Sequence, residues 1–595
     1  MKIPVVKSEK AVTILALLFP VLLEIALYFN VVWYVQLFNI LLLFIVYAVF
    51  LVLFRRLRPS LIGITIVMLA LSIANEFSIN ARSVAFQISD FFCLADAMRL
   101  SGRYSFEVTA VMVRDTIFSA LLLGSTLYLL REFDDKPLKS RMLKRGAATF
   151  CAALPAALFL NLEDHSDGDI KFDINRFTKE NGVLYSLYVE AKQHDIEEPT
   201  GYSKAAAEHV LQTSLTVQNH DRPNIIVVMN ESLADYDLVG ELPLTQDVLP
   251  YLHSMDENCI KGKALVSVFG GYTCQSEWEF LTGNSMAFLP VTAVPYNQFI
   301  EQPIGSIAAS LKEMGYATTA VHPYHGIEWN RDNNYPLMGF DSFVTGEDFG
   351  EVTEEMLETL PEETDESLYF GDLDYIRGFV SDSENYRKLF ELMEEKPDGE
   401  PQFIFNVTIQ NHGSYGYEGA DFEAEEFCKD ASDEVNQYLT VAHESDKALK
   451  KLITYFENYP EDTIILMFGD HQPSLDLPYE RLFADPADAV AVREANYTVP
   501  YVMWANYDVD WEEHEVTSLN YLSAILKENA GLPLDSWDVF RMELMEEYPA
   551  VNSYGAVDAQ GNYLPLRTLL QNSEQVKEYQ HLQYYRMFDE AEVSE

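Results

Sequence analysis

The stretch NIIVVMNES, residues 224–232, contains five consecutive apolar residues and then ends in Asn230, Glu231 and Ser232. An apolar residue at every position predicts a strand that is buried on both faces. Five similar runs follow at 263–269, 316–323, 402–410, 463–471 and 498–505, and helix-like stretches separate them. Alternating strands and helices predict an α/β domain with a mostly parallel sheet that is flanked by helices.

Polar side chains follow four of these runs, at the sheet edge where ligands bind in such folds. Glu231 ends the first run, Thr273 follows the second, His412 follows the fourth, and Asp470 and His471 end the fifth. A helix cap, a turn residue and a loop histidine are the ordinary interpretations of the first three positions. Carboxylates and imidazoles together are the ligands that Mn²⁺, Zn²⁺ or Mg²⁺ accept. The combination predicts a divalent cation with Thr273 as a ligand and an activated nucleophile.

The first 162 residues contain long apolar stretches, each close to the length of about 20 residues that a helix needs to cross a bilayer. These stretches cover residues 12–30, 33–54, 60–77, 108–130 and 146–162. Buried helices of a soluble domain are the alternative, but the segment 33–54 has no polar stripe at helical spacing. The sequence therefore predicts an N-terminal α-helical membrane domain with five transmembrane helices.

The orientation follows from basic residues, which cluster on the cytoplasmic side of membrane proteins. Such clusters lie at the N-terminus, at 55–58 and across 131–145. Five crossings that begin in the cytoplasm place all three clusters inside. We therefore predict a multi-pass protein of the cell membrane with a cytoplasmic N-terminus. Residues 163–220 are expected to form an extracellular linker with short helices, residues 221–550 an extracellular catalytic domain, and residues 551–595 a C-terminal extension.

The composition excludes several kinds of partner. A formal net charge of −51 repels nucleic acid nearly everywhere on the surface. The chain has no G-x-x-x-x-G-K-[ST] and no G-x-G-x-x-G motif, so no nucleotide is expected. Its five cysteines form no C-x-x-C pair, which leaves only a bridge between Cys259 and Cys274 as an open alternative.

Five motifs occur in a fixed order: NIIVVMNES (224–232), GGYTCQSEWEFLTGNS (270–285), HPYHGIEWNRDNNYPLMGFDSF (322–343), QNHGSYGYE (410–418) and GDHQP (469–473). In these motifs the chain resembles the lipoteichoic acid synthase family, phosphoglycerol transferases of the alkaline phosphatase and sulfatase superfamily. The resemblance implies one ion, usually Mn²⁺, with Mg²⁺ or Zn²⁺ as alternatives. It also implies the ligands Glu231, Thr273, Asp470 and His471, with Thr273 as the nucleophile.

The resemblance further assigns four residues to binding of glycerol phosphate: His322, Trp329, Arg331 and His412. The planar guanidinium of Arg331 suits phosphate, because it donates two parallel hydrogen bonds. Sulfatases carry a C-x-P-x-R motif that is absent after Cys274, which disfavours sulfate hydrolysis.

The implied reaction transfers glycerol phosphate from phosphatidylglycerol to a lipid-linked or glycan acceptor through a phosphothreonine intermediate. A phosphoethanolamine transferase, or a phosphodiester hydrolase or sulfatase-like enzyme on the same scaffold, is the nearest alternative. A non-catalytic membrane protein that binds an anionic polymer is an alternative from another class.

Overall fold

The computed structural model describes residues 8–28, 31, 33–82, 85–92, 108–133, 174–192, 196–211, 222–240, 242–290, 293–350, 370–419, 422–429, 431–475 and 494–590. These residues form two compact units. The first contains the described residues up to Lys192, and the second contains those from Ile196 onward.

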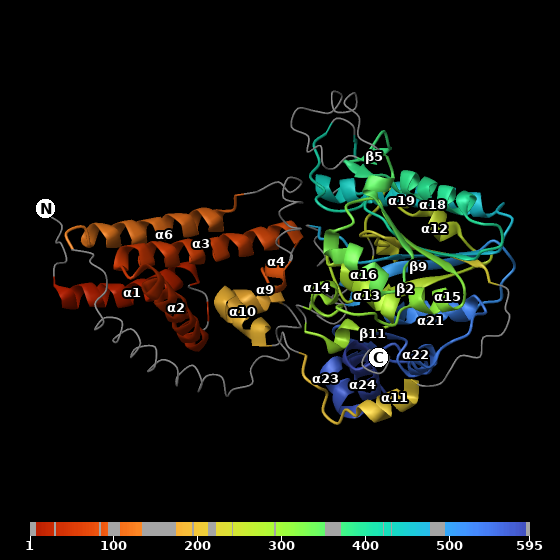
Figure 1. Cartoon of the computed structure of the whole chain (residues 1–595). Coiled ribbons are helices and arrows are strands. Elements are labelled where there is room, and N and C mark those ends of the chain that lie inside the picture. Colours follow the sequence, from red (N-terminus) through yellow and green to blue (C-terminus); the bar gives the residue numbers. More distant parts are fainter. Residues whose placement is uncertain are drawn as a thin grey trace. The chain divides into compact units, whose positions relative to one another are not determined.

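The first unit is built on four long helices that pack side by side: α1 (Glu9–Leu27), α2 (Trp33–Phe54), α3 (Leu57–Arg82) and α6 (Ala110–Leu129) (Figure 1). Each is long and apolar enough to cross a membrane. Large apolar side chains such as Val49, Leu53 and Leu121 stay exposed on these helices, as contact with lipid requires. The helices confirm four of the predicted spans, and the fifth, at 146–162, lies outside the described residues.

Three shorter helices complete the first unit: α4 (Ser89–Phe92), α9 (Ile174–Asn181) and α10 (Val183–Lys192). The amide of Asn39 in α2 donates to the carbonyl of Asn181 at 2.6 Å. Phe38 packs against the rings of Tyr185 and Tyr188 in α10. The two helices α9 and α10 are therefore fixed to the bundle by polar and aromatic contacts.

The second unit contains an eight-stranded sheet with the order β10-β2-β9-β8-β1-β7-β3-β4. Its strands are β1 (Asn224–Asn230), β2 (Cys259–Leu265), β3 (Ala317–His322), β4 (Ser342–Thr345), β7 (Gln402–Val407), β8 (Thr463–Gly469), β9 (Thr498–Ala505) and β10 (Val516–Ser518). Strand β9 runs antiparallel to β8 and β2, whereas the other neighbours pair in parallel. This arrangement confirms the mostly parallel sheet.

The position of the second strand differs from the prediction. The expected strand at 263–269 begins and ends four residues earlier, as β2. Val266 and Val268 are buried although they lie beyond the strand. An apolar run indicates that residues are buried, and it does not distinguish a strand from a buried loop.

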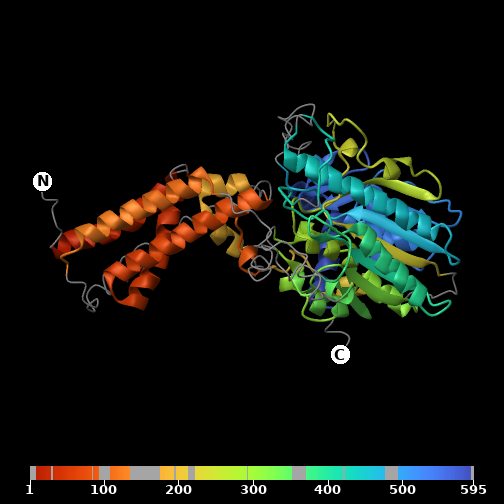
Figure 2. The same cartoon turned by 90° about the horizontal axis from the view of Figure 1, so that it is seen from above.

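Helices cover both faces of the sheet (Figure 2). One face packs against α13 (Thr273–Thr282), α15 (Ile307–Glu313), α21 (Leu519–Asn529) and α22 (Ser536–Glu547), and the other against α12 (Pro250–Ser254), α18 (Asp382–Glu395) and α19 (Asp433–Phe456). Ile225 and Val227 of β1 enter the first core, and Ile226 and Val228 enter the second. This alternation explains why the strand is apolar at both sets of positions.

Short elements lie in the connections between the strands. They are the helices α14 (Pro295–Gln298) and α16 (Arg331–Leu337), the two-stranded sheet of β5 (Tyr375–Ile376) and β6 (Phe379–Val380), and the 3₁₀ helices η1 (Tyr236–Leu238), η2 (Met286–Phe288), η3 (Glu328–Asn330) and η4 (Gly346–Asp348). No disulfide joins Cys259 and Cys274, so the bridge left open by the sequence is not formed.

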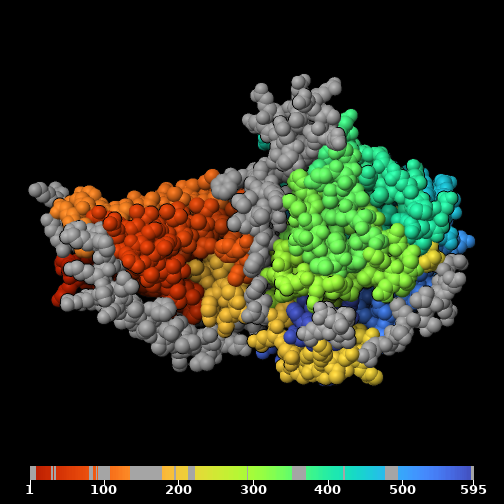
Figure 3. Space-filling view, viewed as in Figure 1, coloured from red at the N-terminus to blue at the C-terminus, as the bar shows by residue number. Residues whose placement is uncertain are grey.

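The C-terminal residues pack into the same core as the sheet. They form β11 (Ala550–Asn552), β12 (Gly555–Val557), β13 (Tyr563–Pro565), α23 (Leu566–Asn572) and α24 (Glu574–Phe588). Helix α11 (Lys204–Leu211) contacts α24, and the space-filling view shows its residues in yellow against the blue C-terminal residues (Figure 3). The segment predicted as an extension therefore contributes to the hydrophobic core of the second unit.

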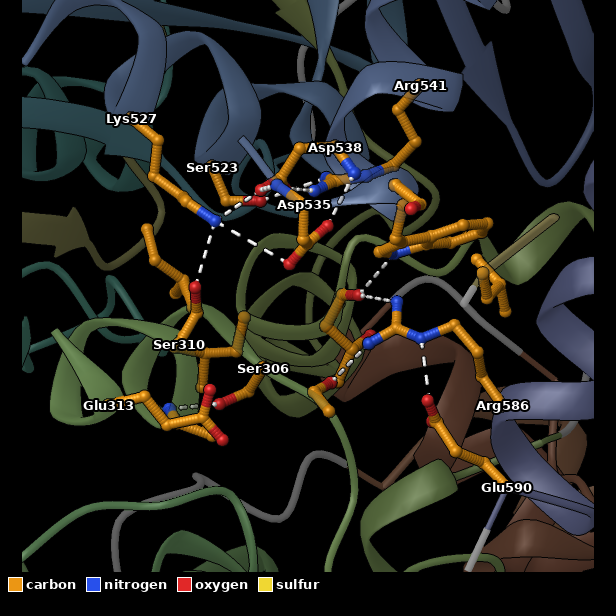
Figure 4. Close-up of a pocket in the computed structure, with 18 residues that line it drawn as sticks. Ser306, Ser310, Glu313, Ser523, Lys527, Asp535, Asp538, Arg541, Arg586 and Glu590 are labelled. Carbon is orange, nitrogen blue, oxygen red and sulfur yellow. Dashed lines mark hydrogen bonds and ion pairs between the residues drawn. The ribbon is translucent and has the colours of Figure 1, made fainter. Parts of the chain in front are cut away.

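Two buried arginines, Arg586 of this segment and Arg541 of α22, lie at the C-terminal end of α13, around a polar cavity of about 220 Å³ (Figure 4). Arg586 of α24 donates to the carbonyls of Thr282 and Gly305, both at 2.8 Å. Arg541 lies against Gly283, which has a left-handed φ of 67°. A Cβ atom at Gly283 would lie 2.3 Å from an Arg541 nitrogen, so only glycine fits there.

We predict that Arg586→Met lowers the free energy of unfolding by about 1–3 kcal/mol, because it removes the donor to the carbonyl of Gly305 and leaves the buried carbonyl of Thr282 with only the indole N–H of Trp537. Thermal or urea unfolding of the full chain measures this change. Lys577→Ala, in an exposed ion pair with Glu574 on the same helix, is the matched control and should change stability by less than about 0.5 kcal/mol. Equal stability of the two variants would contradict the structural role of Arg586.

Candidate metal and active site

The carboxyl ends of β1 and β8 bring two buried carboxylates together. The strands pair in parallel with Asn230 opposite Gly469, so the next residues, Glu231 and Asp470, lie side by side. The imidazole of His471 completes the group, with Nε2 3.6 Å from Glu231 Oε1 and 3.2 Å from Asp470 Oδ2. All three residues are buried, and their ligand atoms lie within 4.8 Å of one another.

Surrounding hydrogen bonds orient these three groups. The amides of Ser232 and His471 donate to Asp470 Oδ1 at 2.7 and 2.8 Å. The ring nitrogen Nδ1 of His471 lies 3.0 Å from the carbonyl of Gln472, which can only accept, so Nδ1 carries the proton. Asp470 Oδ2 and His471 Nε2 are buried and have no hydrogen-bond partner among the described residues. Their lone pairs face each other and Glu231.

The charge of the group fits a divalent cation. Burial, and then the neighbouring Glu231, raise the pKa of Asp470 to about 7. Two adjacent buried carboxylates are costly unless a cation offsets them. Two oxygen ligands and one imidazole nitrogen suit Mn²⁺, Zn²⁺ or Mg²⁺. We therefore regard Glu231, Asp470 and His471 as a candidate metal site.

Thr273 is the first residue of α13 and lies beside this group. Its hydroxyl donates to Glu231 Oε2 at 3.3 Å, and only 7% of the residue is exposed. The N-terminus of a helix favours negative charge, because its amide groups and dipole point toward it. The structure thus places Thr273 with the three predicted metal ligands, in a position where a negatively charged oxygen is stabilised.

Four residues near the site adopt the left-handed conformation that favours glycine: Ser232 (φ 52°), Tyr272 (φ 66°), Trp329 (φ 54°) and Asn330 (φ 61°). Each costs on the order of 1 kcal/mol, and such residues gather where a fold fixes functional groups. The ring of Trp329 lies 5.9 Å from that of Tyr272, measured between centroids. Trp329 therefore borders the turn that carries Thr273.

His322 ends β3 and is buried in a neutral form. Burial, and then the charge of Arg331, hold its pKa well below the usual value. Its Nδ1 lies 2.9 Å from the carbonyl of Val407 and therefore carries the proton. The buried Nε2 has no hydrogen-bond partner among the described residues. This tautomer accepts a hydrogen bond at Nε2 and has its only N–H at Nδ1, which is bound to Val407.

Arg331 is the first residue of α16, and its guanidinium is already bound to a carboxylate. Its Nε donates to Glu277 Oε1 at 3.0 Å, and its Nη2 contacts the same oxygen. The hydroxyl of Tyr335 donates to Glu277 Oε2 at 2.7 Å. Burial disfavours the charged guanidinium, but Glu277 more than offsets this and raises the pKa of Arg331. Sequence reasoning missed Glu277, although a carboxylate four residues after Thr273 was a visible signal.

His412 lies in the loop after β7, where it is partly buried. Its ring packs 5.5 Å from Phe379 of β6. The buried Arg377, between β5 and β6, donates to the carbonyls of Gln410, His412 and Ser414. This arginine was also missed from the sequence, because its partners are backbone carbonyls that leave no pattern in the chain.

A second cluster of possible ligands contains Asp235, Asp237 and His253. Both ring nitrogens of His253 already bind carboxylates, Nε2 to Asp235 at 3.0 Å and Nδ1 to Asp247 at 2.9 Å. Hydrogen bonding to Asp235, and then to Asp247, raises the pKa of His253 to about 9. The ring is thus protonated at neutral pH, and a protonated ring does not bind a metal.

The chain is similar in sequence to several known proteins. A protein assigned by name to cyclic beta-1,2-glucan modification in Rhizobium meliloti (strain 1021) is 25% identical over 497 residues, which cover 78% of this chain and 73% of that protein. Lipoteichoic acid synthase 2 of Bacillus subtilis (strain 168) is 24% identical over 296 residues, covering 47% of this chain and 40% of the synthase.

A solved structure extends the similarity in fold to the helical part of the chain. Lipooligosaccharide phosphoethanolamine transferase A, an integral membrane protein of Neisseria meningitidis, matches with a TM-score of 0.50 and 15% identity, over 89% of this chain and 96% of that one. The sulfatase family model matches residues 223–528, which contain the whole candidate site. The chain therefore belongs to the sulfatase family of the alkaline phosphatase superfamily, and lipoteichoic acid synthases are among its relatives.

Proposed function

We propose that this protein is a membrane-anchored, metal-dependent phosphoglycerol transferase that uses phosphatidylglycerol as its donor. One observation carries the proposal: the hydroxyl of Thr273 lies at a helix N-terminus, 3.3 Å from a carboxylate of a buried cluster that fits a divalent cation. When bound, the cation supplies Lewis-acid stabilisation of negative charge, and we expect Mn²⁺, with Mg²⁺ or Zn²⁺ as alternatives.

In the first step, Thr273 Oγ attacks the phosphorus of the lipid and the bond to diacylglycerol breaks. The proton of the Thr273 hydroxyl passes first to Glu231 Oε2, which already accepts its hydrogen bond. Glu231 passes this proton on to the leaving oxygen, which departs as the hydroxyl of diacylglycerol, and a phosphothreonine diester remains. Helix α13 stabilises the negative charge that develops on the oxygens, through its N-terminal amides.

In the second step, a hydroxyl group of the acceptor attacks the phosphothreonine and restores the Thr273 hydroxyl. His322 Nε2, which is unprotonated, accepts a hydrogen bond from that hydroxyl and orients it. The proton passes to Glu231 Oε2 and from there to Thr273 Oγ as the bond between phosphorus and Thr273 breaks. We place Trp329, Arg331 and His412 around the glycerol phosphate, as the resemblance implies.

The acceptor in this proposal is a glycan or a lipid-linked glycan. The names of the relatives support this choice, since one is assigned to glucan modification and others to lipoteichoic acid synthesis. The four apolar helices keep the catalytic unit close to its lipid donor. We propose that the N-terminus is cytoplasmic and that the catalytic unit acts outside the cell, in agreement with the basic clusters.

Thr273→Ala should lower the release of diacylglycerol from phosphatidylglycerol by at least about a hundredfold, because it removes the attacking oxygen. The assay uses purified full-length protein and labelled lipid in the presence of Mn²⁺. Thr568→Ala, at an exposed position in α23, should keep full activity. Release at the normal rate by Thr273→Ala would exclude Thr273 as the nucleophile.

The same assay with labelled phosphatidylethanolamine tests the nearest alternative. We expect consumption of phosphatidylglycerol at a rate at least about tenfold higher, since the donor head group in this proposal is glycerol. Preferred consumption of phosphatidylethanolamine would identify a phosphoethanolamine transferase. Release of free glycerol phosphate at the same rate with and without a glycan acceptor would identify a hydrolase.

Metal binding should depend on pH through Asp470, whose pKa is raised from 3.8 to about 7 by burial and by Glu231. An acid with a raised pKa in the folded state makes the metal-free protein less stable as the pH rises from about 4 to about 7. A divalent cation requires the ionised carboxylate, so the increase in melting temperature on adding Mn²⁺ should be larger at pH 8 than at pH 5.5.

Asp470→Asn should abolish most of this Mn²⁺-dependent increase, whereas Asp510→Asn, at an exposed position, should preserve it. The measurement is thermal unfolding with Mn²⁺ or EDTA at each pH. A Mn²⁺ effect of equal size in Asp470→Asn would show that the ion binds elsewhere.

A further inference from the structure

We propose that Glu277 determines the charge preference of the active site, so that singly charged phosphodiesters bind better than doubly charged phosphomonoesters. The residue acts through Arg331 and does not itself contact the substrate. This inference rests on the proposed function, because it assumes that phosphate binds between Thr273 and Arg331.

The first observation is the geometry of the ion pair. Glu277 is fully buried, and Arg331 is 2% exposed. Nε and Nη2 of Arg331 both bind Glu277 Oε1, and Nε lies 3.3 Å from Oε2. The remaining nitrogen, Nη1, is not part of this pair. Glu277 therefore occupies one edge of the guanidinium, offsets its charge and fixes the direction of the opposite edge.

The second observation is the position of the pair beside the nucleophile. Glu277 follows Thr273 by four residues in α13, and residues at this spacing lie on the same face of a helix. The charge of Arg331 also acts on His322 at the end of β3. The ion pair therefore lies one helical turn from Thr273 and close to the residues expected around the phosphate.

The third observation is the balance of charge. A divalent cation and Arg331 together carry three positive charges, and Glu231, Asp470 and Glu277 carry three negative charges. With all of these groups present, the site has no positive excess. A phosphodiester brings one negative charge into this site, whereas a phosphomonoester at alkaline pH brings two, and the second charge is unfavourable in a buried site without compensation.

Without the charge of Glu277, the same site has one negative charge fewer around Arg331, which favours the doubly charged ligand. The lipid donor and the phosphothreonine intermediate are both diesters, so Glu277 matches the site to the ligands of the proposed reaction. A purely structural role for Glu277 predicts a different result, namely an equal loss of affinity for both ligand classes when it is replaced.

The experiment measures equilibrium binding by calorimetry in full-length protein that carries Thr273→Ala, so that no ligand is turned over. The probes are glycerophosphoglycerol, a singly charged diester, and glycerol phosphate, which is doubly charged at pH 8.5, each with Mn²⁺ and again with EDTA. Adding Glu277→Gln should lower the dissociation constant of glycerol phosphate, relative to that of glycerophosphoglycerol, by about tenfold. Tyr335→Phe, which removes a hydrogen bond to Glu277 but no charge, should leave the ratio unchanged.

Two further variants test the proposal even if Glu277→Gln does not fold. Arg331→Gln should shift the ratio toward the diester, and Arg331→Gln combined with Glu277→Gln should return it to the starting value, although both affinities fall. An identical ratio in these two variants would overturn the inference, as would an unchanged ratio in folded Glu277→Gln. If the Thr273→Ala protein with Glu277 unchanged binds neither probe, the proposed phosphate site is wrong, and the inference fails with it.

Discussion

Two carboxylates placed at neighbouring strand ends are the constraint on which the rest of the site depends. Parallel pairing of β1 and β8 puts Glu231 beside Asp470, and the sheet leaves both side chains buried. Like charges at this distance repel unless a cation or a proton is shared. Burial, and then this repulsion, raise the pKa of Asp470, and a divalent cation is the simplest group that offsets both.

Helix α13 connects this constraint to the remainder of the domain. Its first residue, Thr273, contacts the carboxylate cluster, and Glu277 one turn later binds Arg331. The carbonyl of Thr282 at its other end is bound by Arg586 from the C-terminal segment. Displacement of this one helix would therefore move Thr273, the Glu277–Arg331 ion pair and the packing of the C-terminal residues together.

The two units of the chain serve different physical purposes. The described helices of the first unit are apolar around their circumference, which suits a lipid environment. The second unit has the buried polar network of an enzyme, in which hydrogen bonds such as that from Ser232 to Asp470 fix each charged group. The lipid donor that we propose explains why one chain contains both, since the reacting phosphate of a lipid stays close to the bilayer.

The sequence by itself determined the four described apolar helices, six of the eight strands of the main sheet and the grouping of Glu231, Thr273, Asp470 and His471. These features depend on local periodicity and on the rule that parallel strands end at one edge, and both can be inferred from chain order. Only the tertiary structure decided the reversed direction of β9, the limits of β2 and the pairing of Glu277 with Arg331. Each of these depends on which surfaces pack together across long separations in the chain, and side-chain partners chosen in that way leave no periodic signal.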